Sequence, residues 1–464
     1  MISPEIQRRI DDVCACLRTK VVEKDDPHIC QRLPDRMAAD RVPGVSIAVI
    51  HNGAVEWAQG FGVAQLGGGP VTADTLFQAG SISKPVAAMA ALHLIEQGKL
   101  ALDSDVNQAL TSWKIPASAA APGAVVTLRE LLSHTAGLTV HGFPGYSAGA
   151  PIPSLVQVLD GEKPANTAPV RLEAAPGSRW KYSGGGYTVM QQLLLDVSHQ
   201  PFPKLMHDTV LAPIGMTRST YEQPLPVELR SSAATPYKAN GAPVEGGSHI
   251  YPEMAAAGLW TTPTDLARYA IEIQRSLLGD SNRVLSTEMT KQMLVAGQGN
   301  HGLGFPIGGS QENPFFSHGG IDEGFEAVLV AYQHSGDGAV IMTNAQGGQL
   351  LATEILRSIA SVYGWPDFHP IVRTSVEVDP AILATYTGVY DFTPTFSITI
   401  TLENGQLMSQ ATYQRKIRLF PESQSKFFAK VVDAQLEFFS TDAGQISHLV
   451  LHQNGNDARG ERRH

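Results

Sequence analysis

The stretch Phe77-Gln-Ala-Gly-Ser-Ile-Ser-Lys-Pro-Val-Ala-Ala-Met-Ala-Ala-Leu-His-Leu-Ile-Glu-Gln-Gly98 decides the fold of this chain. Its first residues have the pattern of a short strand, Gly80 interrupts that strand, and one long helix comes next. Pro85 fits the first turn of the helix, where its missing N–H costs nothing. Because apolar residues lie on almost every side of this helix, we expect it to be buried, with Gly98 ending it.

Ser81 and Lys84 stand at the start of this helix. Three residues apart, they share one helical face, and both lie where backbone N–H groups have no partner within the helix. A serine hydroxyl is a weak nucleophile until a base takes its proton. A lysine can act as that base only when its amine is neutral, a form that burial favours. The N–H of Ser81 is also free to bind a developing oxyanion.

The Ser-x-x-Lys spacing alone is weak evidence, because the chain contains it three times. The other two copies are Ser178/Lys181, which comes after Pro176-Gly177, and Ser423/Lys426, which lies in a β-like run. Neither copy opens a long apolar helix. The context therefore selects Ser81 as the candidate nucleophile.

Length and composition predict a globular protein of two domains, since the chain has 464 residues, 43% of them hydrophobic and 17% charged. The net charge of −10 and the lack of a basic stripe argue against nucleic-acid binding. No run approaches the roughly 18 apolar residues of a membrane span. The N-terminus has no signal-peptide core, so we expect a cytoplasmic protein or, if a signal was removed, a periplasmic or secreted one.

All three cysteines, Cys14, Cys16 and Cys30, lie within the first thirty residues. An odd number without a Cys-x-x-Cys spacing predicts free thiols, and a disulfide at Cys30 is the less favoured alternative. No spacing of histidines, cysteines and carboxylates indicates a metal site, and we expect no cofactor.

The pattern of elements predicts one domain over residues 1–375 and a second over residues 376–464. Val42–Ile50 and Ala54–Ala58 form a hairpin around Asn52-Gly53. A long Gly- and Pro-rich excursion over residues 139–171 predicts a folded loop over the active site. Beyond a linker, short alternating strands such as Phe396–Leu402 predict a small antiparallel β domain, either a barrel or a sandwich.

Several motifs together resemble the serine β-lactamase and penicillin-binding-protein superfamily, specifically its class C-like branch. They occur in the family's order and cover about residues 42–364: Gly80-Ser-Ile-Ser-Lys84, Leu131-Leu-Ser-His-Thr-Ala-Gly-Leu138, Tyr182-Ser-Gly184, Ala257-Gly-Leu-Trp-Thr-Thr-Pro-Thr-Asp-Leu266 and His318-Gly-Gly320. The resemblance implies an α/β (α+β) fold of the β-lactamase/transpeptidase type. In that fold an antiparallel sheet is flanked by helices, with an all-helical region beside it.

By this resemblance, Ser81 is the nucleophile, Lys84 its base partner and Tyr182 the residue that passes the proton to the leaving group. The backbone N–H groups of Ser81 and Ile321 form the oxyanion hole. The third motif lines the substrate with His318, Gly319 and Gly320 on an edge strand, where the two glycines let the substrate backbone lie close. The implied partner is a small molecule or short peptide, and the oligomeric state stays open.

Two departures from the family pattern bear on the substrate. Gly184 stands where the second motif usually ends in asparagine, so an amide that contacts the substrate is missing. His318 stands where the third motif often begins with lysine, and a histidine with its ordinary pKa near 6.5 is mostly neutral at pH 7. Both changes favour an aminopeptidase, amidase or esterase over the alternatives, a class C β-lactamase or a D-alanyl-D-alanine carboxypeptidase. An acylated sensor without turnover, or a binding scaffold, is the alternative of another class.

Other residues compete for a role. Gly145-Tyr-Ser-Ala-Gly149 matches a nucleophile elbow, but Ser147 lacks the strand before it and the helix after it that an elbow needs. His134 is interpreted as bonding its own turn, and His93 as a satisfied core residue. The remaining candidates divide evenly between a role at the pocket and a structural one: Asp322, Glu323, Trp180, Trp260 and Tyr146.

Overall fold

The computed structural model describes residues 2–24, 26, 29–453 and 455–463. The chain divides into two compact units, Met1–Gln7 with Pro34–Thr353, and Arg8–Leu33 with Glu354–His464. These units differ from the expected ranges 1–375 and 376–464. One reason is that β1 (Val21–Glu23) pairs in parallel with β10 (Ile371–Arg373), so N-terminal residues group with the C-terminal part.

The first unit is built on a six-stranded sheet of order β3-β2-β9-β8-β7-β6, in which every neighbouring pair is antiparallel. Its strands are β2 (Gly44–His51), β3 (Ala54–Gly62), β6 (Ile307–Gly309), β7 (Pro314–Asp322), β8 (Phe325–Tyr332) and β9 (Gly338–Thr343). The predicted hairpin is present as β2 and β3. A two-stranded sheet of β4 (Phe77–Gln78) and β5 (Trp260–Thr261) lies outside this sheet.

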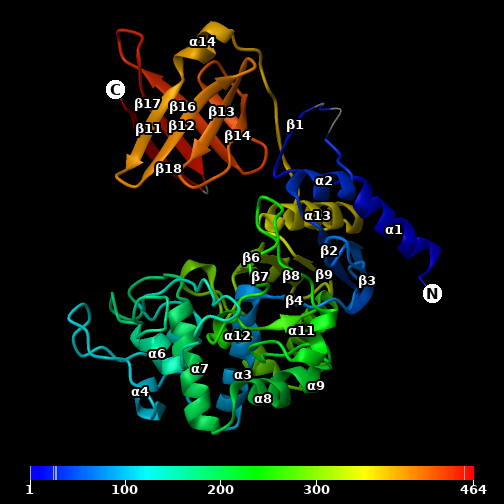
Figure 1. Ribbon diagram of the computed structural model, residues 1–464, viewed down its shortest axis with the longest axis vertical. Helices are drawn as coiled ribbons and strands as arrows, with labels where there is room; N and C mark the ends of the chain where they lie inside the picture. Colours follow the sequence, from blue (N-terminus) through cyan, green and yellow to red (C-terminus); the bar gives the residue numbers. More distant parts are fainter. Residues whose placement is uncertain (1, 25, 27–28, 454, 464) are drawn as a thin grey trace. The chain divides into compact units, whose positions relative to one another are not determined.

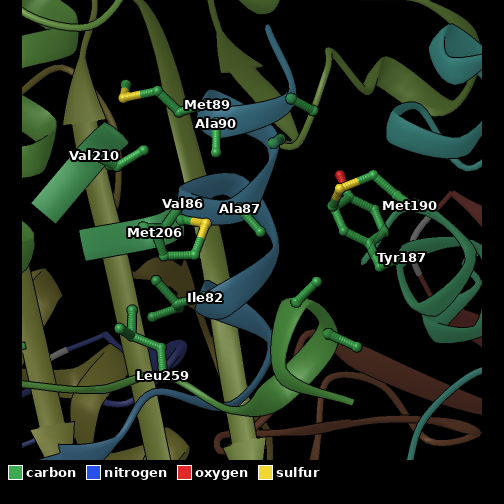
Figure 2. Packing of buried hydrophobic residues seen from close by; sticks show 14 of the residues in the cluster. Ile82, Val86, Ala87, Met89, Ala90, Tyr187, Met190, Met206, Val210 and Leu259 are labelled. Atoms are coloured by element: carbon green, nitrogen blue, oxygen red, sulfur yellow. The ribbon is translucent and has the colours of Figure 1, made fainter. Parts of the chain in front are cut away.

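The predicted buried helix is η1 (Gly80–Ile82) followed by α3 (Ser83–Glu96). Eleven of the fourteen residues of α3 are buried, which agrees with its apolar character on every side. Figure 2 shows Met206 and Val210 on one side of α3 and Tyr187 and Met190 on the other. Burial fixes the position of the helix start, and with it the position of Ser81.

Of the other helices of the first unit, α7, α8, α10 and η2 pack against α3, and α11 packs on β2, β3 and β9. Their bounds are α2 (Leu33–Asp40), α4 (Val106–Ala109), α5 (Leu128–Leu132), α6 (Leu155–Asp160), α7 (Gly184–Ser198), α8 (Phe202–Met206), η2 (His207–Leu211), α9 (Ala212–Ile214), η3 (Val227–Ser232), α10 (Met254–Ala257), α11 (Pro263–Leu278), α12 (Thr287–Leu294) and η4 (Gln298–Asn300). None of the described helices is long and apolar enough to cross a membrane.

The second unit contains a closed antiparallel barrel of β11 to β18 (Figure 1, orange to red), which decides between the barrel and the sandwich expected from the sequence. Its strands are β11 (Gly388–Thr393), β12 (Phe396–Glu403), β13 (Gln406–Ala411), β14 (Ile417–Pro421), β15 (Lys426–Ala429), β16 (Ala434–Ser440), β17 (Ile446–Gln453) and β18 (Asn456–Arg462). Pairing of β11 with both β12 and β18 closes it. Three helices complete the labelled elements: α1 (Pro4–Ala15), α13 (Gly348–Tyr363) and α14 (Pro380–Thr385). The predicted fold class is thus confirmed.

The expectation of free thiols is wrong for two of the three cysteines. Cys16 and Cys30 form a disulfide, and Cys14 is free. The reason is local, because Leu17 and Gln31 exchange two backbone hydrogen bonds of 2.8 and 3.0 Å. This bridge holds the preceding cysteines with their Cα atoms 4.3 Å apart, close to the range that a disulfide spans.

Candidate active site

Ser81 and Lys84 lie together at the start of the buried helix. Lys84 Nζ is 2.9 Å from Ser81 Oγ and donates a 2.8 Å hydrogen bond to the Ala256 carbonyl oxygen of α10. The lysine side chain extends inward, since only 2% of its surface is exposed. Within the described residues its amine forms no ion pair with a carboxylate. The arrangement therefore brings an amine to the hydroxyl in a water-poor setting.

The edge strand β7 runs close past this turn. A Cβ on Gly80, whose φ is +51°, would lie 2.4 Å from the Ile321 nitrogen. A Cβ on Gly320 would lie 1.9 Å from the Ala79 carbonyl oxygen. Both positions therefore need glycine for the two backbones to approach. Because β6 pairs only with residues 314–316 of β7, no strand of the described residues pairs with β7 from Ser317 to Asp322 on that side.

Tyr182 reaches the site from the turn before α7. Ser183 caps that helix by accepting a hydrogen bond from the Gly186 N–H at 2.9 Å. Lys84 Nζ lies 5.0 Å from the centre of the Tyr182 ring and 5.9 Å from that of Tyr187, at cation–π distance. The Tyr182 hydroxyl makes no hydrogen bond within the described part of the chain.

Gly184 is enclosed by the excursion that comes after α5. A Cβ at this position would meet the Phe143 ring at 2.9 Å and the His141 carbonyl oxygen at 3.0 Å. The Gly184 and Gly185 N–H groups donate to carbonyl oxygens of the same segment, at 3.1 and 2.9 Å. The excursion is thus folded onto the second motif, and the asparagine usual at this position has no room here.

His318 lies on β7 with its side chain on the face that meets η1, since side chains alternate along a strand and Gly320 packs on Ala79. Its Nδ1 is 2.6 Å from the Gly319 carbonyl oxygen, and its Nε2 is buried without a partner. Its ring centre is 6.4 Å from that of Tyr182. Burial, and after it the nearby Lys84, lower the pKa of His318 to about 3.

Two further histidines and a tryptophan surround Tyr182. The His134 ring is 4.3 Å from the Tyr182 ring, and its Nδ1 accepts a hydrogen bond from the Ser183 N–H at 3.2 Å. The prediction that His134 bonds its own turn is therefore wrong, because the second motif supplies the donor. His301 lies 4.8 Å from the His134 ring and 6.0 Å from Trp180. Burial lowers the pKa of His134 well below its usual value and that of His301 to about 4.

Two buried carboxyls, those of Asp322 and Glu253, lie near the site. The sequence analysis left the position of Asp322 open and did not consider Glu253. Asp322 is 4% exposed, and burial raises its pKa well above the usual range, against smaller opposing effects of Lys84, the Gly80 N–H and the Tyr251 hydroxyl. Glu253, just before α10, has neither oxygen hydrogen-bonded, and burial raises its pKa to about 8. Side chains alternate along a strand, so the position of Asp322 four residues after His318 could have placed both side chains on one face of β7. Nothing in the sequence indicated a role for Glu253.

The competing candidates lie elsewhere or are satisfied. Ser147 is exposed in a turn with neither an elbow strand nor an elbow helix. His93 bonds the Val284 carbonyl oxygen at 2.7 Å. Trp260 and Tyr146 are buried, whereas Trp180 is 37% exposed beside His301. Glu323 donates its N–H to the Tyr251 hydroxyl. Among the described residues no group of three or more ligating side chains could hold a metal ion.

Comparisons with known proteins show the family and the fold. Residues 30–363 match the profile of the family described as Beta-lactamase, and residues 372–462 match a domain of unknown function, DUF3471. An uncharacterised protein of Mycobacterium tuberculosis is 31% identical over 253 residues, which are 49% of this chain and 60% of that protein. The chain thus spans less than two thirds of that relative.

The names of two other similar proteins state an activity or a protein class. Esterase EstB of Burkholderia gladioli is 27% identical over 298 residues, covering 58% of this chain and 74% of the esterase. The octameric penicillin-binding protein homologue from Pyrococcus abyssi aligns with a TM-score of 0.61 at 22% identity, over 92% of this chain and 98% of that one. At this identity the structural likeness shows the fold alone.

Proposed function

Because the chain belongs to the Beta-lactamase family, whose members are serine hydrolases, we propose that it hydrolyses amide or ester bonds of small substrates through an acyl-enzyme on Ser81. The observation that carries this proposal is the amine of Lys84, buried and 2.9 Å from the Ser81 hydroxyl. A second hydrogen bond, from Lys84 Nζ to the Ala256 carbonyl oxygen, holds the amine beside the serine.

In the acylation step Ser81 Oγ attacks the substrate carbonyl carbon, and its proton passes to the Lys84 amine, which acts as the base. The bond from that carbon to the leaving nitrogen or oxygen then breaks, and the leaving atom takes a proton through the Tyr182 hydroxyl. Water, deprotonated by the same groups, attacks the acyl carbon and releases Ser81. Lys84 Nζ lies 5.0 Å from the centre of the Tyr182 ring, which supports a role for both residues at one site.

The oxyanion is assigned to the backbone N–H groups of Ser81 and Ile321. The close approach of Ile321 to Gly80 supports this pairing, since it brings the two N–H-bearing segments together at the turn that carries the nucleophile. Fixed donors aimed at a developing charge are worth about 3–4 kcal/mol each in acyl-transfer enzymes.

We favour uncharged amides, peptides with D-residues and short esters as substrates. The pKa of His318, lowered to about 3 by burial, keeps this side chain neutral at physiological pH, so it supplies no positive charge for a substrate carboxylate. The glycine at position 184 supplies no amide. A class C-type β-lactamase or D-alanyl-D-alanine carboxypeptidase is the second candidate, and a sensor that stays acylated is the third.

The proposal is tested by incubating wild type and Ser81→Ala with a p-nitrophenyl ester, a D-alanyl anilide and a chromogenic cephalosporin, followed by mass spectrometry of the protein. We expect turnover of the ester and the anilide, and an acyl adduct on Ser81 that the variant lacks. Turnover that persists in Ser81→Ala would remove the proposal. Rapid cephalosporin turnover would favour the second candidate, and an adduct that never leaves would favour the third.

A further inference from the structure

The hydrogen bond of His318 fixes which of its ring nitrogens carries the proton. Nδ1 is 2.6 Å from the Gly319 carbonyl oxygen. A carbonyl oxygen only accepts, so Nδ1 must donate and therefore bears the hydrogen. A neutral imidazole has one such hydrogen, and the opposite nitrogen, Nε2, is then a bare lone pair. At the position where related sites often have a lysine donor, this chain has a hydrogen-bond acceptor.

This acceptor has no partner within the described chain, although it is buried. His318 is 6% exposed and lies on the face of β7 that meets η1, beside the Tyr182 ring. An unpaired buried acceptor is costly, so one that lies beside the nucleophile turn indicates a donor supplied by a ligand or by water. The unpaired Nε2 thus belongs to a side chain on the face of β7 that meets the nucleophile turn, with its ring centre 6.4 Å from that of Tyr182.

We propose that His318 Nε2 accepts a hydrogen bond from a neutral donor on the substrate, a carboxamide N–H, and that the site rejects a carboxylate in the same place. This inference rests on the proposed acyl-enzyme function and names the substrate group that the site selects. A carboxylate would oppose its oxygen lone pairs to the lone pair of Nε2. Neither partner would have a hydrogen to share.

The surroundings of His318 argue against two alternatives, a protonated imidazole that binds a carboxylate and a substrate ammonium that donates to Nε2. Protonation of the imidazole would let it bind a carboxylate, but burial and the Lys84 amine both oppose the charged form. A substrate ammonium would also supply a donor, but it would carry its charge into a buried position, which is costly without a paired anion. A neutral donor avoids both conflicts.

His301 provides a matched control within the chain. Its Nδ1 is 2.9 Å from the Gly302 carbonyl oxygen, so it has the same tautomer, and its Nε2 is also buried without a partner. It packs against His134 and Trp180 and does not lie on β7. A preference that comes from His318 should survive substitution of His301.

The test compares pairs of esters that differ only in carboxamide against carboxylate. One pair has the group on the leaving side: the 3-carbamoylphenyl and 3-carboxyphenyl esters of phenylacetic acid. The other has it on the acyl side: the p-nitrophenyl esters of adipic acid monoamide and of adipic acid. We measure kcat/KM for wild type, His318→Lys, His318→Gln and His301→Gln, with thermal unfolding of each variant and mass spectrometry of the adduct.

We expect wild type to prefer the carboxamide by about tenfold or more in at least one pair, because a site with an unpaired buried group discriminates strongly. His318→Lys should reverse the preference, His318→Gln should bring it near parity, and His301→Gln should keep it. Equal or better use of the carboxylate in both pairs, with Ser81 acylated, would overturn the inference. Loss of the preference in His301→Gln would overturn the assignment to His318. If no ester acylates Ser81, the proposed function itself fails, and this inference with it.

Discussion

The same four-residue pattern gives two different environments in the first unit. Lys84 is 2% exposed and bonds Ser81 and a backbone carbonyl. Lys181 has a side chain 31% exposed and pairs with Glu173, while Ser178 donates its hydroxyl to the Ala175 carbonyl oxygen. The difference comes from the next residues along the chain: a fully apolar helix after Lys84, and a turn that enters the glycine-rich second motif after Lys181. Spacing places a serine and a lysine, and burial decides whether they can act together.

The largest expected effect is the difference between substituting Ser81 and substituting Ser178. Ser81→Ala removes the attacking oxygen, so kcat/KM for a p-nitrophenyl ester should fall at least about a thousandfold. Ser178→Ala removes a surface hydroxyl and should leave kcat/KM within about twofold, as should Ser147→Ala. Steady-state kinetics on the three variants checks this. A large loss in Ser178→Ala with Ser81→Ala still active would invert the assignment.

The next effect concerns the two lysines. Lys84→Met keeps an apolar stem of similar length but removes the base, so kcat should fall by about a thousandfold while the fold is kept. Lys181→Met breaks only a partly exposed ion pair with Glu173, which contributes about 1 kcal/mol or less, and activity should be unchanged. Kinetics combined with urea denaturation separates the two results. Equal kinetic losses in both variants would show that burial is not what distinguishes them.

Much of this contrast was predictable from sequence, because it depends on local pattern. The apolar run after Lys84 predicted a buried helix, whereas only the family resemblance implied that Tyr182 would lie near it. The capping box at Thr127–Glu130 and the hairpin at Asn52-Gly53 were likewise local, and both are present. Such features depend on backbone periodicity and turn chemistry within a few residues.

The features that were not predicted depend on contacts between separate segments of the chain, and a single sequence does not show which segments meet. The donor to His134 comes from Ser183, and the groups that influence the pKa of Asp322 include the Gly80 N–H of η1 and the Tyr251 hydroxyl. The Cys16–Cys30 disulfide forms beside one antiparallel bridge between Leu17 and Gln31. No local spacing fixes such pairings, so the burial of a titratable group could not be read from its neighbours in sequence.

The last comparison concerns the pH dependence of stability contributed by the carboxyl near each lysine. The hydrogen bond from Lys181 holds the pKa of Glu173 below its usual value, whereas burial raises the pKa of Asp322. A lowered folded pKa adds stability above about pH 4.5 that is lost as the pH falls, and a raised one removes stability as the pH rises from about 4. The two carboxyls should therefore act on the pH profile with opposite signs.

Asp322→Asn should gain stability relative to wild type as the pH rises from about 4 to 8, by at most about 1.4 kcal/mol per pH unit. Glu173→Gln should lose about 1 kcal/mol or less near pH 7, and nothing near pH 3, because the pair that it breaks is partly exposed. Urea denaturation of both variants at several pH values measures these slopes. The sign of the slope is the critical readout, since an asparagine that fits poorly would lower stability by a similar amount at every pH. A slope for Asp322→Asn with the sign of the Glu173 variant would mean that Asp322 is ionised beside Lys84, and the two lysines would then both be ordinary ion-pair residues.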